Sequence, residues 1–142
     1  MKNTPEDLII EEPGNEAIDK QILDGLKAYN RSKIGPYTPA SFTIYIKSEN
    51  AEMLAGLNGE FLEDVCNVKH LWVDEHHRNK GLGKRLIYQL EQFLKTKNCP
   101  IIQLYTADFQ AKDFYEKLGF TTLVSIEKGF MGHSSHFMRK VL

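Results

Sequence analysis

The stretch that decides the fold runs Leu71-Trp72-Val73-Asp74-Glu75-His76-His77-Arg78-Asn79-Lys80-Gly81-Leu82-Gly83-Lys84-Arg85-Leu86. Its first three residues end a predicted strand over residues 65–73, and its glycines open a helix whose apolar side chains recur at helical spacing. The first amides of a helix lack intrahelical acceptors and carry the positive end of the helix dipole, so they attract an anion. Glycines let the backbone approach that anion closely, and Arg78, Lys80 and Lys84 add charge attraction. The turn is therefore predicted to bind a pyrophosphate.

The Arg-x-x-Gly-x-Gly pattern alone is a weak signal. A helix start that uses its glycines only for tight packing would look the same. The Walker A sequence and the three-glycine dinucleotide fingerprint are both missing, so neither of those nucleotide-binding turns is predicted here.

The elements on either side follow from hydrophobic spacing and turn residues. They are an amphipathic helix over 15–32 capped by Asn15, hairpin strands over 42–46 and 53–62, a helix from the glycines to Asn98 and Pro100, a strand over 101–105, a short helix over 111–118, and strands over 120–126 and 136–142 around a loop with Gly129 and Gly132. With the apolar patch Leu8-Ile9-Ile10 as a first strand, the order is β-α-β-β-β-α-β-α-β-β. This order predicts an α/β or α+β fold with one mixed sheet, in a single domain over residues 1–142.

Composition excludes several classes of partner. Eighteen basic and nineteen acidic residues give a net charge of −1, so no nucleic-acid or membrane partner is predicted. The apolar runs are too short to span a bilayer, and the first residues lack a secretory pattern. Cys66 and Cys99 form neither a disulfide scaffold nor a thiolate metal cluster. We expect a soluble, cytoplasmic domain, and a homodimer stays open.

A second motif sharpens the prediction. Residues 71–86 resemble the acetyl-CoA-binding motif of the GNAT-family N-acetyltransferases, and Ala111-Lys112-Asp113-Phe114-Tyr115-Glu116-Lys117-Leu118-Gly119-Phe120 resembles the second motif of that family. Both occur in the family's order and spacing, and the element order matches along nearly the whole chain. The resemblance implies a mixed central sheet with a splayed, V-shaped cleft and helices on both faces.

The resemblance also implies roles for individual residues. The pantetheine arm of acetyl-CoA would lie along Leu71, Trp72 and Val73, and the pyrophosphate would be held by the turn of Arg78, Asn79, Lys80, Gly81, Leu82, Gly83 and Lys84. Tyr115 matches the tyrosine that protonates the departing CoA thiolate, a transfer between groups of similar ordinary pKa. Asp108 stands where many relatives have an asparagine near the cofactor arm, and an ionised carboxylate cannot donate a hydrogen bond.

The general base stays open among Glu63, Asp64 and His70, which lie on or just before the central strand. Histidine is the residue type best suited to proton transfer near neutral pH, although a lone histidine in a strand is more often structural.

Three further features have plainer interpretations. His133 and His136 lie three residues apart in a predicted loop without nearby ligands, so no metal site is predicted. Cys99 has no adjacent base and is not predicted to be a nucleophile. The loop over 127–135, with Phe130 and Met131, is predicted to lie near the acceptor, and the first helix with residues 34–40, including Tyr37, to form the facing wall.

The sequence therefore favours an acetyl-CoA-dependent N-acetyltransferase that acetylates a primary amine of a small molecule or peptide directly, without a metal. A longer acyl-CoA donor is one alternative, and a non-catalytic CoA-binding sensor or interaction module is another. The retained Tyr115 argues against the last.

Overall fold

The computed structural model describes residues 7–142, which separate into two compact units, one ending at Tyr37 and one running from Thr38 to Leu142. The first unit contains helix α1 (Glu16–Ile34). The Asn15 side chain caps it by accepting a hydrogen bond from the Ile18 amide at 3.2 Å, and Gly35 ends it at a φ of 87°. The predicted strand at Leu8–Ile10 is wrong, because among residues 7–142 no segment pairs with it and its residues are not in strand conformation.

The second unit is built on one six-stranded mixed sheet in the order β1-β2-β3-β4-β6-β5. Its strands are β1 (Ala40–Lys47), β2 (Met53–Leu62), β3 (Val65–Val73), β4 (Ile101–Ala107), β5 (Thr121–Phe130) and β6 (His133–Val141). Only β3 and β4 pair in parallel, and the other neighbours are antiparallel. This confirms the predicted mixed sheet and α/β fold.

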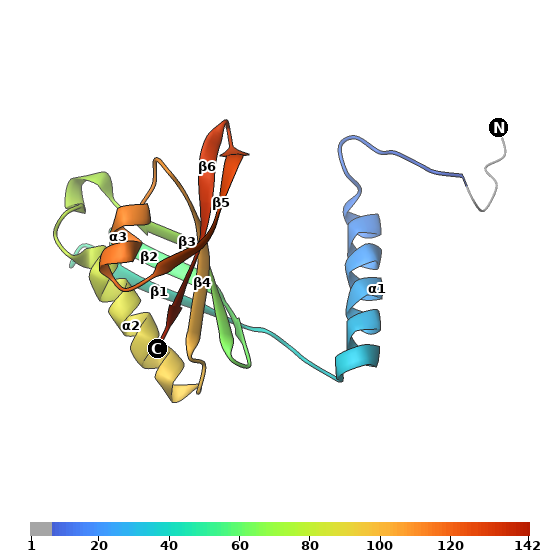
Figure 1. Cartoon of the computed structure of the whole chain (residues 1–142), viewed down its shortest axis with the longest axis horizontal. Helices are drawn as coiled ribbons and strands as arrows, with labels where there is room; N and C mark the ends of the chain where they lie inside the picture. The colour runs from blue at the N-terminus through green and yellow to red at the C-terminus, as the bar shows by residue number, and fades with distance from the viewer. Residues whose placement is uncertain (1–6) are drawn as a thin grey trace. The chain divides into compact units, whose positions relative to one another are not determined.

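Helices α2 (Leu82–Thr96) and α3 (Lys112–Lys117) pack on one face of this sheet (Figure 1). The helical spacing of α2 buries Leu86, Ile87, Leu90 and Leu94, which join inward-facing strand residues such as Leu57, Cys66, Ile102 and Met138 in one core. A short 3-10 turn, η1 (Glu75–His77), connects β3 to the glycine turn before α2. In residues 7–142, no helix combines the length and apolar character needed to cross a bilayer.

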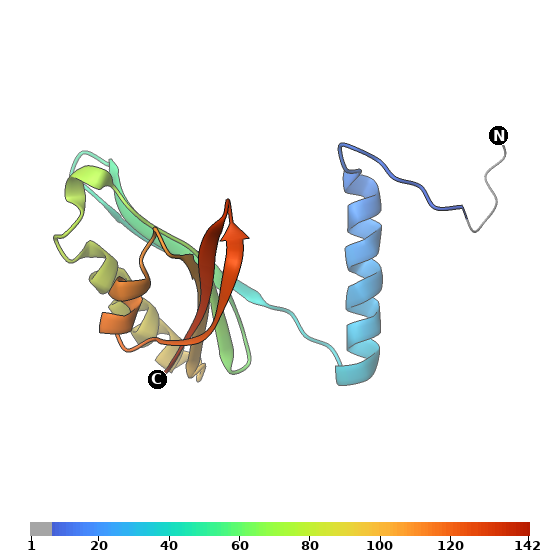
Figure 2. The ribbon, with the colours of Figure 1, turned by 45° about the horizontal axis from the view of Figure 1, so that its top comes forward.

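Strands β3 and β4 separate soon after they meet. Their parallel pairing covers only Val65–Asn67 against Ile101–Gln103, whereas β3 stays paired with β2 up to Val73 and β4 with β6 up to Ala107. The sheet therefore divides into two halves joined by a three-residue seam, and Figure 2 shows the halves diverging. The two strands leave backbone edges facing each other beyond the seam.

The loop predicted over residues 127–135 is mostly strand. Phe130 pairs with His133, and Met131 and Gly132 form a two-residue turn with φ values of 48° and 81°. Positive φ at both central positions is typical of the tight turns that join β-hairpins. Gly129 has no room for a side chain, because a Cβ there would collide with the Ser135 hydroxyl of the neighbouring strand. Gly129 and Ser135 therefore lie where β5 and β6 approach each other closely, although glycine and serine indicated a loop in the sequence.

Candidate active site

A cleft of about 1110 Å³ occupies the space where the two halves of the sheet diverge. Most of the residues predicted to bind the cofactor line it, together with the predicted acid: Leu71, Trp72, Val73, Arg78, Asn79, Gly81, Leu82, Gly83, Lys84 and Tyr115. Lys80 and Asp108 are not among the lining residues. The opposite wall comes from β4 and the segment that leads into α3. Segments far apart in the sequence thus meet around one cleft.

The glycine turn at the start of α2 presents backbone amides without backbone acceptors. Among the described residues, no hydrogen bond from the amides of 79–84 to a backbone carbonyl is found in this turn. The backbone hydrogen bonds of α2 begin with the Arg85 amide, which donates to the Gly81 carbonyl at 3.0 Å. Because no acidic residue lies in the first turn of α2, the positive end of its dipole is not neutralised there. The turn therefore has the features of an anion site.

The two glycines of the turn are needed for different reasons. Gly81 precedes the helix at a φ of 82°, in the left-handed region that side chains other than glycine rarely adopt. Gly83 lies under the ring of Phe114, and a Cβ at this position would be 3.0 Å from the ring's Cζ. Gly81 thus allows the chain to turn, whereas Gly83 allows α2 and α3 to approach closely. Asn79 also has a positive φ, of 61°.

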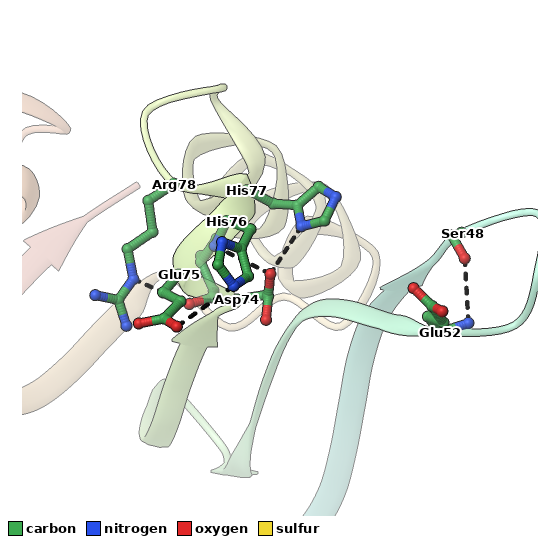
Figure 3. Close-up of polar contacts among 8 residues, drawn as sticks. Ser48, Glu52, Asp74, Glu75, His76, His77 and Arg78 are labelled. Atoms are coloured by element: carbon green, nitrogen blue, oxygen red, sulfur yellow. Dashed lines mark hydrogen bonds and ion pairs between the residues drawn. The ribbon is translucent and has the colours of Figure 1, made fainter.

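A set of contacts between β3 and the turn fixes the position of Arg78 (Figure 3). The Asp74 carboxylate accepts the His76 amide at 3.1 Å and contacts His77 Nδ1 at 2.8 Å, which stabilises η1. The hydrogen bond from His77, with a second from the His76 amide, lowers the pKa of Asp74. Arg78 Nε donates to the Val73 carbonyl at 3.2 Å, so its guanidinium is held at the end of β3, beside the cleft. The sequence pointed to Arg78 but not to the role of Asp74 and His77.

Tyr115 lies within α3, and its ring packs edge-on against Phe114 and Phe120 at centroid distances of 5.1 and 5.5 Å. The residue is 6% exposed, yet it lines the cleft. In the described part of the chain its hydroxyl has no protein hydrogen-bond partner and is not sealed from solvent. Burial raises the pKa of Tyr115 to about 12, so the phenol stays protonated near neutral pH. The ordinary pKa values of a phenol and a thiol are close, but burial raises that of Tyr115. The two values match again only if the cleft also desolvates the departing thiolate and raises the pKa of its thiol.

Asp108 fastens the β5–β6 hairpin to the segment between β4 and α3. One carboxylate oxygen contacts His133 Nδ1 at 2.9 Å, and the other accepts the Ser134 amide at 3.2 Å. Desolvation acts to raise the pKa of Asp108, but the hydrogen bonds from Ser134 and His133 outweigh it, and the net pKa is lowered. The ring of Phe109 packs edge-on against His133 at 4.8 Å. Both oxygens of Asp108 thus have partners within the chain.

The three base candidates lie in different places. Glu63 and Asp64 form the β2–β3 turn, at the closed end of the sheet, where the Asp64 carbonyl accepts the Ile101 amide at 3.0 Å. His70 lines the cleft. Its Nδ1 lies 3.0 Å from the side-chain oxygen of Asn58, at the point where the β2–β3 register shifts. The amide oxygen can only accept, so in the neutral ring this contact favours the tautomer with the hydrogen on Nδ1, which leaves the lone pair of Nε2 free.

The remaining histidines and cysteines have separate surroundings. His136 Nδ1 contacts the Ser125 hydroxyl at 2.8 Å, whereas His133 contacts Asp108. In residues 7–142 no three His, Cys, Asp or Glu side chains are grouped closely enough to hold a metal ion. Both cysteines are buried, and desolvation raises the pKa of each thiol, to about 12 for Cys66. Neither thiol therefore favours the nucleophilic thiolate form.

Gln110 closes the β4–α3 segment and was missed from the sequence. Its side-chain oxygen accepts the Ala107 amide at 2.7 Å, and the Thr106 hydroxyl accepts the Ala111 amide at 3.3 Å. These bonds hold the cleft wall that leads to Tyr115. No local pattern in the sequence indicates them, since a glutamine next to a phenylalanine fits many surface loops.

Comparisons with known proteins agree with this geometry. A model of the acetyltransferase (GNAT) family matches residues 16–120. A blasticidin-S acetyltransferase from Streptomyces morookaense is 31% identical over 132 residues, which are 92% of this chain and 97% of that protein. The crystal structure of an acetyltransferase from Bacillus cereus ATCC 14579 has 29% identity and a TM-score of 0.82, covering 94% of this chain and 98% of that chain.

A fold likeness extends to a candidate streptothricin acetyltransferase from Bacillus anthracis, solved in complex with acetyl coenzyme A. It has 22% identity and a TM-score of 0.65 over 74% of this chain and 64% of that chain. The family match covers both motifs and the elements between them, and the relatives align along nearly the whole chain. The chain therefore belongs to the GNAT family of acetyltransferases and is an acyltransferase.

Proposed function

We propose that this protein transfers an acetyl group from acetyl-CoA directly to a primary amine of a small molecule. One observation carries the proposal: a turn of free backbone amides and the protonated hydroxyl of Tyr115 line the same cleft. The first is suited to the pyrophosphate of CoA and the second to its departing thiolate. Acetyl-CoA would supply an activated thioester carbonyl.

The residues that would hold acetyl-CoA fit its chemistry. The amides of 79–84 and the guanidinium of Arg78 offer donors to the pyrophosphate. The edge of β3 beyond Asn67 is not paired with β4, so its backbone groups are available to the amides of the pantetheine arm. Asp108 stays a predicted cofactor contact, although it does not line the cleft and its oxygens contact His133 and Ser134 of the β5–β6 hairpin.

His70 is the residue we assign as the general base. It lines the cleft on the part of β3 that is not paired with β4, and Asn58 orients its ring so that Nε2 can accept a proton from the ammonium group of the acceptor. The neutral amine that results is the nucleophile. The amine nitrogen bonds to the thioester carbon, and Tyr115 gives its proton to the sulfur as the carbon–sulfur bond breaks. The nitrogen loses its second proton as the amide forms, and through solvent this proton can restore the Tyr115 hydroxyl. In this proposal His70 acts as the base and Tyr115 as the acid, so each proton transfer uses its own residue.

The test couples binding to turnover. CoA at about 100 times its dissociation constant should stabilise the fold by roughly 2.7 kcal/mol, which a melting curve resolves. A panel of amines with acetyl-CoA, read by thiol release, should then identify an acceptor, and blasticidin-S is the first to test because the Streptomyces relative is named for it. A melting temperature unmoved by millimolar CoA would overturn the cofactor assignment. CoA binding without thiol release on any amine would overturn the transfer reaction.

A further inference from the structure

A second hollow, of about 500 Å³, lies on the sheet across β1, β2 and β3. We call it the sheet-face hollow. Its lining comprises Thr43, Tyr45, Lys47, Met53, Gly56, Leu57, Asn58, His70 and Trp72. Tyr45, Asn58 and Trp72 alternate along their strands with Ile44, Leu57 and Leu71, which pack into the core with α2. The hollow therefore opens on the face opposite α2.

The sheet-face hollow continues the cofactor cleft. His70 and Trp72 line both, so the exposed edge of β3 forms a shared wall. A molecule seated in the hollow would lie beside His70, on the face of the sheet opposite α2. This is where an acceptor amine has to be if His70 removes its proton.

The register of the strands gives the hollow a flat slot. Tyr45 pairs with Gly56, and Gly56 pairs with Trp72, so two aromatic residues flank a glycine in one row across the sheet. Residues two strands apart are separated by roughly 10 Å. A planar ring stacked between two aromatic rings needs about 7–8 Å between them. Gly56 adds no side chain to this row, and the end of the flexible Met53 side chain borders the space, with its methyl group 3.6 Å from where a Gly56 Cβ would lie. A ring that stacks over Gly56 therefore displaces this methyl group.

The next row and the rim supply polar groups. Thr43 pairs with Asn58, and Asn58 pairs with His70, placing hydrogen-bonding groups beside the slot. Lys47 lies on the rim with its ammonium 5.8 Å from the centre of the Tyr45 ring. Among the described residues, those lining the hollow include this cation and no carboxylate. The charge of the hollow thus favours an anionic group on its ligand.

We propose that the sheet-face hollow is the acceptor site, and that it selects an amine carrying a planar unsaturated ring, which stacks between Tyr45 and Trp72 over Gly56, and an anionic group bound by Lys47. This inference rests on the proposed function and names the substrate class of the same site. Tyr45, Gly56 and Trp72 are then the residues that determine specificity, because they set the width of the slot.

Binding can be measured without turnover, because Trp72 is the single tryptophan of the chain. The probe is 4-(aminomethyl)benzoate, which combines a planar ring, a primary amine and a carboxylate. Titrated into protein saturated with CoA, it should quench tryptophan fluorescence saturably. Two control probes each lack one feature: trans-4-(aminomethyl)cyclohexanecarboxylate has a puckered ring, and benzylamine has no carboxylate. Each should bind at least about fivefold more weakly than the benzoate probe, an effect on the order of 1 kcal/mol.

Gly56→Val is the decisive variant. A Cβ at Gly56 meets its nearest neighbours at 3.4–3.6 Å, which is ordinary contact, so the fold accepts it while the methyl groups enter the slot. The variant should bind the benzoate probe at least about tenfold more weakly and keep the wild-type stabilisation by CoA. Ser41→Val adds similar bulk on β1 outside the hollow and should change neither. Lys47→Met should weaken the benzoate probe and leave benzylamine unchanged.

The outcomes separate this inference from the proposed function. Probe binding at wild-type strength in Gly56→Val, or equal binding of the planar and puckered probes, would overturn the slot. Normal stabilisation by CoA with no fluorescence response to the probe would overturn the acceptor site while the acetyltransferase proposal stands. Loss of CoA stabilisation in the wild type would instead count against the proposed function.

Discussion

Replacing Tyr115 by phenylalanine tests the proposed acid by removing a single oxygen. The ring contacts with Phe114 and Phe120 are retained, and the hydroxyl has no hydrogen-bond partner among the described residues. The free energy of unfolding near neutral pH should therefore change by less than about 1 kcal/mol. Removal of a general acid typically slows the reaction about 10²–10⁴-fold. We expect kcat to fall by that factor while the affinity for acetyl-CoA stays close to that of the wild type.

The raised pKa adds a second signature of the same residue. The pKa of Tyr115 is about 12 in the folded protein against an ordinary value of 10. As the pH rises through this window, the unfolded chain loses the proton first, so the folded state becomes less stable. Two pKa units correspond to about 2.7 kcal/mol, which sets the scale of the loss between these two pH values. Tyr115→Phe cannot ionise here, so its stability should fall less steeply over the same range.

The assays are kcat at saturating acetyl-CoA on an identified acceptor, and urea unfolding at a series of alkaline pH values. Tyr88→Phe is the matched control, because Tyr88 lies on the exposed side of α2 and does not line the cleft. A Tyr115→Phe enzyme that turns over as fast as the wild type would refute the assignment. Another group would then protonate the thiolate, and Tyr115 would be a packing residue only.

Two further predictions concern the cofactor turn and the hairpin. Gly81→Ala forces a side chain into the left-handed region and should cost about 1–2 kcal/mol of stability. Gly83→Ala displaces the Phe114 ring. Both variants should weaken CoA binding in calorimetry, and wild-type affinity in either would mean that the turn does not hold the pyrophosphate. Asp108→Asn replaces the carboxylate that contacts His133 by an amide, so we expect a lower melting temperature with no gain in CoA affinity. Tighter CoA binding in this variant would show that position 108 faces the cofactor.

Elements whose signals are local could be predicted from the sequence. The helix spacing after Gly83 and the strand ending at Val73 are both confirmed within a residue or two. The V-shaped cleft was expected from the resemblance of the two motifs to the GNAT family. Such patterns need only a neighbouring core to become buried, and they do not depend on which distant segment supplies it.

Features that depend on distant partners could not be predicted. Asn58 and His70 meet because β2 and β3 pair with a shifted register, and Ser135 aligns with Ala107 on β4. The segment after Ile126 resembles a loop by composition, and its strand structure resumes because Phe130 pairs with His133 beyond a register shift. The patch at Leu8 has a strand-like composition but no partner strand among residues 7–142, so composition alone was misleading there.

The three-residue seam between β3 and β4 also bears on folding and aggregation. Beyond Asn67 and Gln103 the sheet has two internal edges, and unpaired strand edges are the surfaces through which β-proteins associate with other chains. Here each edge lies inside the cleft, where the opposite half-sheet limits the approach of another polypeptide. A ligand extended along β3 would act there as a supplied strand, slowing hydrogen exchange of the amides over 68–73 and coupling the two half-sheets into one cooperative unit.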